Sequence, residues 1–218
     1  MLKRRPTALL LRSPENQVHL EDMKRYYPKV DWIDAPMPPL PGHGEKKDER
    51  DQLLVSLATA KNQYPITDFV IYSRAYGAFS EEGRAAIESI FSVPVITAPG
   101  AVLEQLHTLG ASKLYVITPY GQAHHDHELR WLYEQGFEVI ASSCLGHDTG
   151  GEIQNLLAAD IVAALRPTFS LKSGLDAVYI ACTVVRTPAM AEDLQDAATV
   201  PIVSATQAML WKLEKLVG

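Results

Sequence analysis

The sequence predicts an α/β fold with two similar Rossmann-like halves, each a four-stranded parallel sheet flanked by helices, related by a pseudo-two-fold duplication. Two observations predict it. Short strands that are apolar throughout alternate with helical stretches, which is typical of parallel sheets buried on both faces. The same order of segments also occurs twice in the 218 residues. Two such halves would leave an active-site cleft between equivalent strand ends.

The duplication is clearest in two matched segments. The run Asp68-Phe-Val-Ile-Tyr-Ser-Arg74 parallels the run Asp176-Ala-Val-Tyr-Ile-Ala-Cys182. A Val-Pro strand follows each run, with its proline 20 residues after Arg74 and 19 residues after Cys182. Upstream, residues 8–14 and 28–34 parallel residues 114–119 and 136–141. The alternative is that the two halves are not duplicates and share only the βαβ order of elements common to α/β proteins. The matched Asp, Pro and terminal Gly positions argue against this alternative.

These matches define the elements and the domains that we expect. The first half comprises residues 1–98 plus 206–218, and the second comprises residues 99–205. Helices are expected at residues 15–27, 46–63, 80–91, 101–109, 121–135, 151–165, 188–198 and 206–217. Ser80 and Thr187 are predicted to cap the amino termini of two of them. The proline-rich loop 35–44 is either a lid, a long connection or a ligand for a partner domain.

Composition excludes several classes of protein. The net charge is −6, so the chain lacks the excess of basic residues that nucleic-acid binding needs. No apolar run approaches the roughly 20 residues of a membrane span, and the first apolar run is too short for a signal peptide. Two cysteines make a disulfide framework improbable. We therefore expect a cytoplasmic protein with reduced thiols, no nucleic-acid partner and no membrane partner.

Cys182 is the first candidate for chemistry. It follows a buried strand directly and precedes a helical stretch. A thiol at such a strand end can be exposed to a ligand, and nearby backbone amides at a helix amino terminus can lower its pKa. Thr183 adds a hydroxyl and a backbone N–H beside it. A buried cysteine that behaves as a small apolar residue is the alternative. The duplication places Arg74 at the equivalent position of the first half.

Four motifs resemble one enzyme family along the whole chain. The stretch Asp176-Ala-Val-Tyr-Ile-Ala-Cys-Thr-Val-Val-Arg-Thr187 resembles the second-cysteine motif of the aspartate/glutamate racemase superfamily. The branch is that of maleate cis-trans isomerase and arylmalonate decarboxylase. Residues 200–211, 116–120 and 13–16 resemble its closing motif, its Thr-Pro-Tyr motif and its asparagine-bearing loop.

The resemblance implies a mechanism with no cofactor and no metal. Cys182 would be the catalytic thiol, and Thr183 would supply a backbone amide. Tyr120 would donate its phenol to a substrate carboxylate, and Asn16 would hold the other end of the substrate. Fixed donors of this kind stabilise an enediolate in a dry site. The alternatives are that Tyr120 only ends a strand and that Asn16 only caps a helix.

The first-half motif departs from the family pattern. Where the family usually reads Cys-Thr-Ser-Gly-Ser-Phe, this chain reads Arg74-Ala-Tyr76-Gly-Ala-Phe79. Arginine does not readily release a proton, so a two-thiol racemase or isomerase mechanism loses one partner. A single thiol resembles the arrangement in arylmalonate decarboxylase. Arg74 would then bind a carboxylate through its planar fork, and Tyr76 would add a hydroxyl; a surface arginine in an inactive site is the alternative.

Two further groups are weaker candidates. Cys144 is expected to end the strand 138–143, as a structural thiol or as a compensating second thiol. The segment 124–127 holds three histidines and an aspartate, but consecutive helical residues point apart, and only His124 and His127 share a face. We therefore predict no metal site.

The sequence thus favours a cofactor-independent enzyme that acts on a small carboxylate, most closely an arylmalonate-decarboxylase-like lyase with one cysteine. A maleate cis-trans isomerase or an Asp/Glu-type racemase is the first alternative. A catalytically retired carboxylate-binding protein is the second. The only partner predicted is the small carboxylate substrate, and a homodimer or a higher homo-oligomer is left open.

Overall fold

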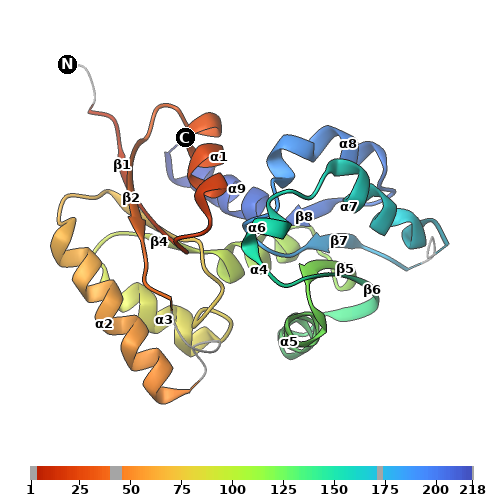
Figure 1. Cartoon of the computed structure of the whole chain (residues 1–218), viewed down its shortest axis with the longest axis horizontal. Coiled ribbons are helices and arrows are strands. Elements are labelled where there is room, and N and C mark those ends of the chain that lie inside the picture. The colour runs from red at the N-terminus through yellow and green to blue at the C-terminus, as the bar shows by residue number, and fades with distance from the viewer. Residues whose placement is uncertain (1–3, 40–45, 171–173, 218) are drawn as a thin grey trace. The chain divides into compact units, whose positions relative to one another are not determined.

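The computed structural model describes residues 4–39, 46–170 and 174–217, and the chain divides into two compact units. The first unit is Met1–Ala101 with Met209–Gly218, and the second is Val102–Ala208. Each unit holds one four-stranded sheet in which every strand pairing is parallel (Figure 1). The predicted α/β fold with two parallel sheets is confirmed.

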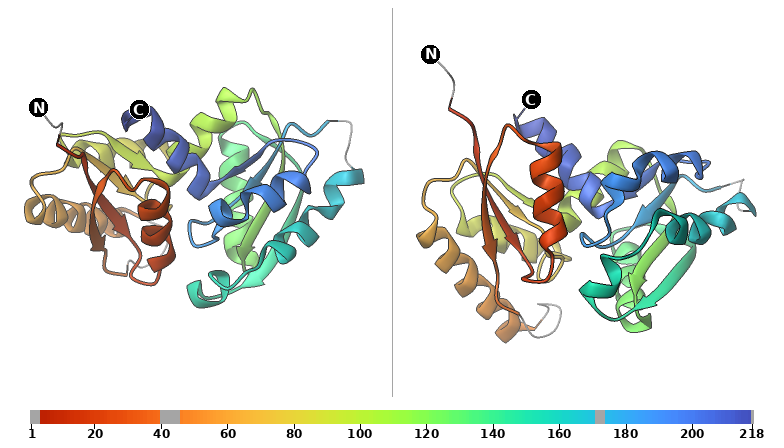
Figure 2. Two further views of the ribbon diagram at one scale, coloured as in Figure 1. Left: turned by 90° about the horizontal axis from the view of Figure 1, so that it is seen from above. Right: turned by 45° about the horizontal axis from the view of Figure 1, so that its top comes forward.

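The sheet of the first unit has the strand order β2-β1-β3-β4. Its strands are β1 (Thr7–Arg12), β2 (Asp31–Pro36), β3 (Phe69–Tyr72) and β4 (Val95–Thr97). Its helices are α1 (Gln17–Tyr26), α2 (Lys47–Gln63) and α3 (Glu81–Ile90), with the end of α9 (Ala205–Val217). Helices α2 and α3 cover one face, where Leu57 and Ile87 join the same apolar core as Leu9. Helices α1 and α9 lie on the opposite face (Figures 1 and 2).

The sheet of the second unit repeats this order as β6-β5-β7-β8. Its strands are β5 (Lys113–Tyr120), β6 (Glu138–His147), β7 (Ala177–Ile180) and β8 (Ile202–Ser204). Helix α4 (Ala98–Thr108) leads into the unit, and α5 (Gln122–Glu134), α6 (Gly150–Ile153), α7 (Ala158–Leu165) and α8 (Ala191–Asp196) complete it. A 3₁₀ helix, Arg166–Ser170, follows α7, and a second, Thr187–Met190, precedes α8. Helices α6, α7 and α8 contribute Ile153, Ile161 and Leu194 to one core, and α5 lies across the other face (Figure 1).

Equivalent aspartates fasten the central strands in both units. The Asp68 carboxylate accepts the Thr7 backbone N–H at 2.6 Å. The Asp176 carboxylate accepts the backbone N–H groups of Ser112 and Lys113 at 2.8 Å each. These backbone hydrogen bonds are the main reason that the pKa of each carboxyl is lowered. The matched aspartates of the sequence therefore have the same structural role in each unit.

Several predicted boundaries are wrong. The helix expected at 151–165 is two separate helices, α6 and α7. The Asp160 carboxylate accepts the Leu157 N–H at 2.8 Å and so caps the amino terminus of α7. Ser80 caps α3 as predicted, by accepting the Gly83 N–H at 3.0 Å. Thr187 caps nothing: it is the first residue of a 3₁₀ helix, and its hydroxyl bonds to Ser204 at 2.6 Å. The strand expected to stop at 143 continues to His147.

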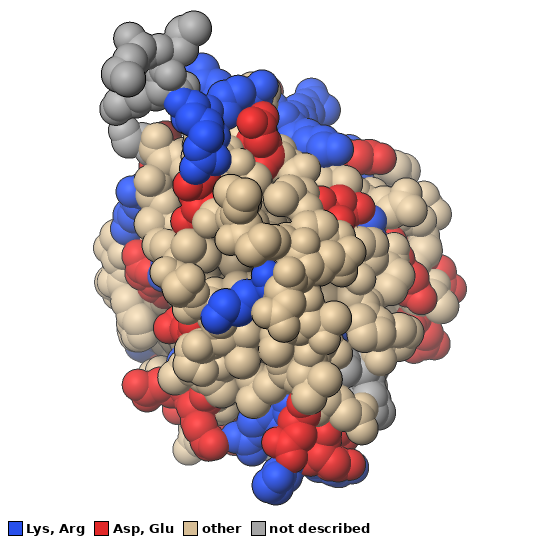
Figure 3. Space-filling view, turned by 90° about the vertical axis from the view of Figure 1, so that its left-hand side faces the viewer, with Lys and Arg blue, Asp and Glu red and all other residues tan. Residues whose placement is uncertain are grey.

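The charged side chains do not form a continuous basic stripe on the face that Figure 3 shows. Acidic and basic side chains are interspersed there, and the centre of the view is mostly uncharged. Within the described residues, none of the helices has the length and apolar character that crossing a bilayer requires.

Candidate active site

The candidate residues lie at the carboxyl ends of the two central strands of each sheet. In the first unit, Asn16 follows β1 and Arg74 follows β3; in the second, Tyr120 ends β5 and Cys182 follows β7. The order of the strands reverses between β1 and β3 in the first sheet and between β5 and β7 in the second. In the first sheet, for example, β2 lies on one side of β1 and β3 lies on the other. Ligands of open parallel sheets bind at such points. The structure therefore locates two of the predicted residues at the carboxyl ends of the central strands of each unit.

Cys182 sits in an unusual backbone conformation. Its φ is +78°, in the left-handed region that favours glycine. The Val184 N–H points back to the Cys182 sulfur at 3.4 Å, so the thiol lies in the bend of its own turn. The side chain is partly exposed. Thr183 is also partly exposed, and its carbonyl accepts the Thr206 hydroxyl at 3.5 Å.

The Cys182 thiol remains protonated at neutral pH. Burial raises its pKa above the ordinary value, while hydrogen bonds from the Val184 amide and the Tyr120 hydroxyl act in the opposite direction. Burial also raises the pKa of Tyr120 well above its ordinary value. Both groups are therefore neutral and can donate protons or hydrogen bonds across the physiological range.

Cys144 lies close to this pair but has a structural partner. Its thiol donates to the Tyr120 carbonyl at 3.0 Å across the β5–β6 pairing. The ring of His124 lies 5.9 Å from the Tyr120 ring. Cys144 is thus held as part of the sheet, in agreement with the structural alternative.

Arg74 is buried in the first unit, with 7% of its surface exposed. Its Nη1 donates to the Pro38 carbonyl at 2.9 Å, and its guanidinium lies 5.3 Å from the centre of the Tyr76 ring. Among the described residues its Nε has no hydrogen-bond partner. A buried N–H without a partner is costly, and a ligand carboxylate would satisfy it. Pro38 belongs to the proline-rich loop 35–44, for which a lid was one of the predicted roles; residues 40–44 of this loop lie outside the described residues.

Asn16 has the structural role that the sequence left open. Its Oδ1 accepts the His19 N–H at 3.3 Å and caps α1. Arg12 braces the same loop, with two bonds of 2.7 Å to Asp34 and bonds to the Ser13 and Pro14 carbonyls at 3.0 and 2.9 Å. Asn16 is therefore fixed in place, whether or not it also contacts a substrate.

Sequence reasoning missed a buried hydrogen-bonded pair in the second unit, Glu128 and Tyr179. Glu128 on α5 is buried, with 4% of its surface exposed, and it accepts the Tyr179 hydroxyl at 2.8 Å. Burial raises the pKa of Glu128 to about 7. The signal was available, because Glu128 lies three and four residues before the buried Trp131 and Leu132 and hence on the inner face of the helix.

The histidine segment is divided between surface and core. His125 is buried and bonds to Thr118 at 2.7 Å and to Ser142 at 3.0 Å. Across the described ranges, no group of three or more His, Cys, Asp or Glu side chains is arranged to hold a metal ion.

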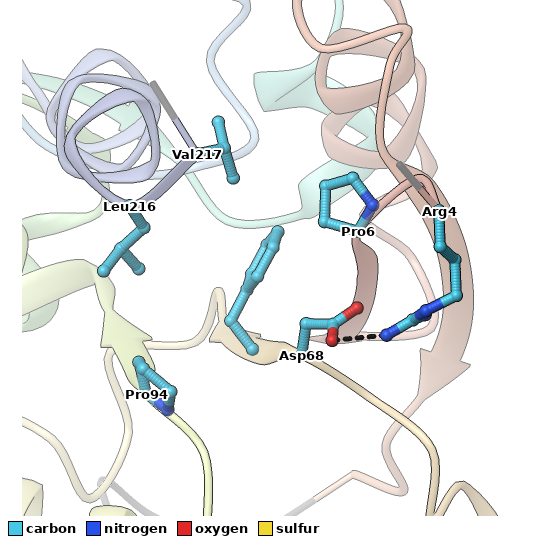
Figure 4. A pocket seen from close by; sticks show the side chains of 7 residues that line it. Arg4, Pro6, Asp68, Pro94, Leu216 and Val217 are labelled. Atoms are coloured by element: carbon cyan, nitrogen blue, oxygen red, sulfur yellow. Dashed lines mark hydrogen bonds and ion pairs between the residues drawn. The ribbon is translucent and has the colours of Figure 1, made fainter. Parts of the chain in front are cut away.

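A surface pocket lies elsewhere, at the amino-terminal edge of the first sheet (Figure 4). It is lined by Arg4, Pro6, Asp68, Phe69, Pro94, Leu216 and Val217. Figure 4 draws an ion pair in this pocket between Arg4 and Asp68, at 2.6 Å. Since Arg74 and Asn16 follow the opposite ends of the same strands, this pocket is separate from the candidate site.

A family model described as arylmalonate decarboxylase matches residues 71–218. The chain belongs to the arylmalonate decarboxylase family. A maleate isomerase of Geobacillus stearothermophilus is 25% identical over 179 residues, covering 77% of this chain and 69% of the relative.

Solved structures of this family and of maleate isomerases share the fold. Unliganded arylmalonate decarboxylase has a TM-score of 0.79 at 20% identity, covering 98% of this chain and 93% of that one. A Nocardia farcinica maleate cis-trans isomerase with a covalently bound succinylcysteine intermediate has a TM-score of 0.80 at 16% identity, covering 96% and 91%.

Proposed function

We propose that this protein is a cofactor-independent enzyme that decarboxylates a small malonate-type dicarboxylate, with Cys182 as its single catalytic thiol. Membership of the arylmalonate decarboxylase family supports an enzyme acting on carboxylates. The observation that carries the finer proposal is the placement of Cys182 directly after the central strand β7, at a φ of +78° and with the Val184 N–H directed at its sulfur at 3.4 Å. Burial also raises the pKa of this thiol, which favours its neutral form. A neutral thiol is what a proton donor must be.

The reaction needs only protein groups and water. The bond from the α-carbon to one carboxylate breaks, carbon dioxide leaves, and the electron pair remains as an enediolate on the other carboxylate. The S–H bond of Cys182 then breaks as its proton moves to the α-carbon. The resulting thiolate regains a proton from water. Hydrogen bonds from Tyr120 and the Thr183 amide would stabilise the enediolate charge.

The remaining candidates would bind the carboxylates. Arg74 can offer its Nε and one terminal nitrogen side by side to a carboxylate, since its Nη1 is engaged by Pro38. Tyr76 would add its hydroxyl, and Asn16 would use its amide Nδ2. Each of these roles is part of the proposal.

Maleate isomerisation is the second candidate, because the Geobacillus relative is a maleate isomerase. The arginine at position 74 argues against it, because the family pattern has a cysteine there and a guanidinium is a poor nucleophile. A carboxylate-binding protein without turnover is the third candidate, and the Arg74–Pro38 contact is compatible with it.

The first test compares Cys182→Ala with Cys144→Ala in deuterated water. NMR would follow maleate, aspartate, methylmalonate and phenylmalonate. We expect carbon dioxide loss with one deuterium placed at the α-carbon, about 10²- to 10⁴-fold slower in Cys182→Ala. Cys144→Ala should keep the parental rate, because its thiol only bonds to a carbonyl. Fumarate from maleate would favour the isomerase, and carboxylate binding without turnover would favour the binding protein.

The second test concerns Arg74. Arg74→Lys keeps the charge but loses the fork, so we expect KM for the active substrate to rise by roughly 10- to 100-fold, the range of a charged hydrogen bond. Arg84→Lys is the control, since Arg84 bonds to the Ala78 and Phe79 carbonyls on the same loop. An unchanged KM in Arg74→Lys would remove Arg74 from the substrate site and leave it as a tether for Pro38.

A further inference from the structure

Arg74 is a buried cation whose contacts are to neutral groups. Only 7% of its surface is exposed. Its Nη1 donates to the Pro38 carbonyl at 2.9 Å, and its guanidinium lies 5.3 Å from the centre of the Tyr76 ring. None of the ion pairs found among residues 4–39, 46–170 and 174–217 includes Arg74. The described part of the chain therefore supplies no counter-charge for this guanidinium.

Arg12, the second buried arginine of this unit, shows the usual way in which such a charge is compensated. It is 4% exposed, and its Nε and Nη2 each donate to the Asp34 carboxylate at 2.7 Å. Buried charges are normally paired in this way or bound to a ligand, because an unpaired buried charge is very costly. Arg74 is similarly buried but lacks the carboxylate, and its Nε has no partner among the described residues. These contacts indicate a binding site for an anion.

The loop that carries Arg74 is held in place before any ligand binds. The Tyr72 hydroxyl donates to the Tyr76 carbonyl at 2.7 Å. Arg84 donates to two further carbonyls of the loop, at 3.1 and 2.6 Å. Donors that are fixed in advance lose little freedom when a ligand binds. The Nε and a terminal nitrogen on one edge of the Arg74 fork match the two oxygens of a planar carboxylate.

The proposed reaction leaves neither malonate carboxylate for this cation. The carboxylate that departs as carbon dioxide gives up its charge, so a guanidinium bound to it would stabilise the ground state more than the transition state. The carboxylate that remains becomes the enediolate, for which the proposed reaction already uses Tyr120 and the Thr183 amide as donors. A carboxylate on the substituent of the α-carbon keeps its charge throughout, so it can bind Arg74 without opposing the chemistry.

We propose that Arg74 is a specificity-determining residue that binds a third carboxylate, carried on the α-substituent, so that the preferred substrates are malonates with an acidic side chain. The inference rests on the proposed function. Carboxymethylmalonate is a compact probe of this class. The bond from its α-carbon to one geminal carboxylate breaks, carbon dioxide leaves, and the electron pair stays as the enediolate. The S–H proton of Cys182 moves to the α-carbon, which gives succinate with the side-chain carboxylate unchanged.

The first arm of the test measures binding alone. In a Cys182→Ala background, which lacks the proton donor, calorimetry compares carboxymethylmalonate with its neutral isostere carbamoylmethylmalonate. We expect the tricarboxylate to bind roughly 10- to 100-fold more tightly, the range of a hydrogen bond to a charged group. Adding Arg74→Met should bring this ratio close to one, because methionine fills space without a charge. Arg50→Met is the matched control and should keep the ratio, because Arg50 is paired with Glu82 at 2.7 Å.

Three results would overturn the proposal: equal affinity for the two compounds, no binding of either compound, or a ratio that survives Arg74→Met. If Arg74→Met does not fold, Arg74→Gln is measured in the same way, because its amide keeps a donor for the Pro38 carbonyl.

The second arm separates this inference from the proposed function. NMR in deuterated water follows both compounds with the wild type. We expect succinate with one deuterium on a methylene carbon, formed with a kcat/KM roughly 10- to 100-fold above that for the neutral isostere. Decarboxylation of both compounds at equal rates would support the proposed function and overturn the role of Arg74. Tighter binding of the tricarboxylate without turnover would support the carboxylate site at Arg74 and remove the decarboxylase.

Discussion

At the scale of the residue, Cys182 is the most constrained position. It is the one non-glycine with a positive φ among the described residues. An L-residue in that region costs roughly 1–2 kcal/mol relative to the right-handed region. Glycine would occupy the same turn without that cost. A side chain retained against this cost indicates that the thiol contributes something other than stability.

This strain can be measured. We expect Cys182→Gly to be more stable than Cys182→Ala by about 1 kcal/mol, because glycine accepts a φ of +78° and alanine does not. Urea unfolding of both variants at one pH gives the difference. At Cys144, which lies in β6, the order should reverse, with Cys144→Ala above Cys144→Gly. An alanine variant at 182 that equals or exceeds the glycine variant would show that the turn carries no strain.

At the scale of the element, rigid strands and pinned loops hold the polar groups. The loop between β3 and α3 is fixed at its far end by the Ser80 cap, and Arg84 bonds to the Ala78 carbonyl at 3.1 Å and the Phe79 carbonyl at 2.6 Å. Gly77 within it has a φ of +74°, and a Cβ there would collide with the Leu53 side chain. The glycine of the first-half motif therefore has a backbone reason to be there.

The sequence predicted the positions of those helices and strands whose determining residues are neighbours in the chain. Strands such as β3 and β7 are apolar at every position, and the Ser80 cap has its signal next to it in the chain. The break between α6 and α7 was not predicted, because the Asp160–Leu157 bond gives no change in apolar periodicity. The extension of β6 depends on its pairing with β5, which includes the distant pair of Tyr120 and His147.

Candidate-site residues divide in the same way. Cys182 and Arg74 were predicted because the duplication places them at strand ends. Glu128 was missed because a glutamate in an amphipathic helix is normally solvent-exposed, and only its partner Tyr179, 51 residues away in the chain, shows that this one is buried. The sequence contains the helical spacing that would have revealed it, but not the hydrogen bond.

At the scale of the whole molecule, a buried histidine in the first unit and a buried glutamate in the second have opposite effects on the pH dependence of stability. His19 in the first unit is fully buried, and burial with the nearby Arg12 charge lowers its pKa from 6.5 to about 3. His19 therefore binds a proton in the unfolded chain at a pH where it stays neutral in the folded protein. Because of this, the free energy of unfolding falls as the pH drops below 6.5. At pH 5 this loss is about 2 kcal/mol.

Glu128 in the second unit acts in the reverse direction. Its folded pKa of about 7 lies above the ordinary 4.5, so the folded protein takes up a proton before the unfolded chain does. Its contribution to stability is full below 4.5 and is lost as the pH rises through about 7. Between pH 7 and pH 5 it adds about 2–3 kcal/mol, which offsets the loss from His19. Asp68 and Asp176, with lowered pKa values, act only at more acidic pH.

The opposing contributions of His19 and Glu128 to the pH dependence of stability can be measured by substituting one residue at a time. On going from pH 7 to pH 5, we expect Glu128→Gln to lose about 2–3 kcal/mol more unfolding free energy than the wild type, and His19→Leu to lose about 2 kcal/mol less. Urea unfolding at both pH values measures this, with Glu134→Gln as the control that should keep the wild-type slope, because Glu134 is an exposed glutamate on the same helix as Glu128. If the units unfold in separate transitions, each change should appear only in the transition of its own unit. Equal slopes in Glu128→Gln and the wild type would mean that Glu128 is ionised in the folded protein throughout this range.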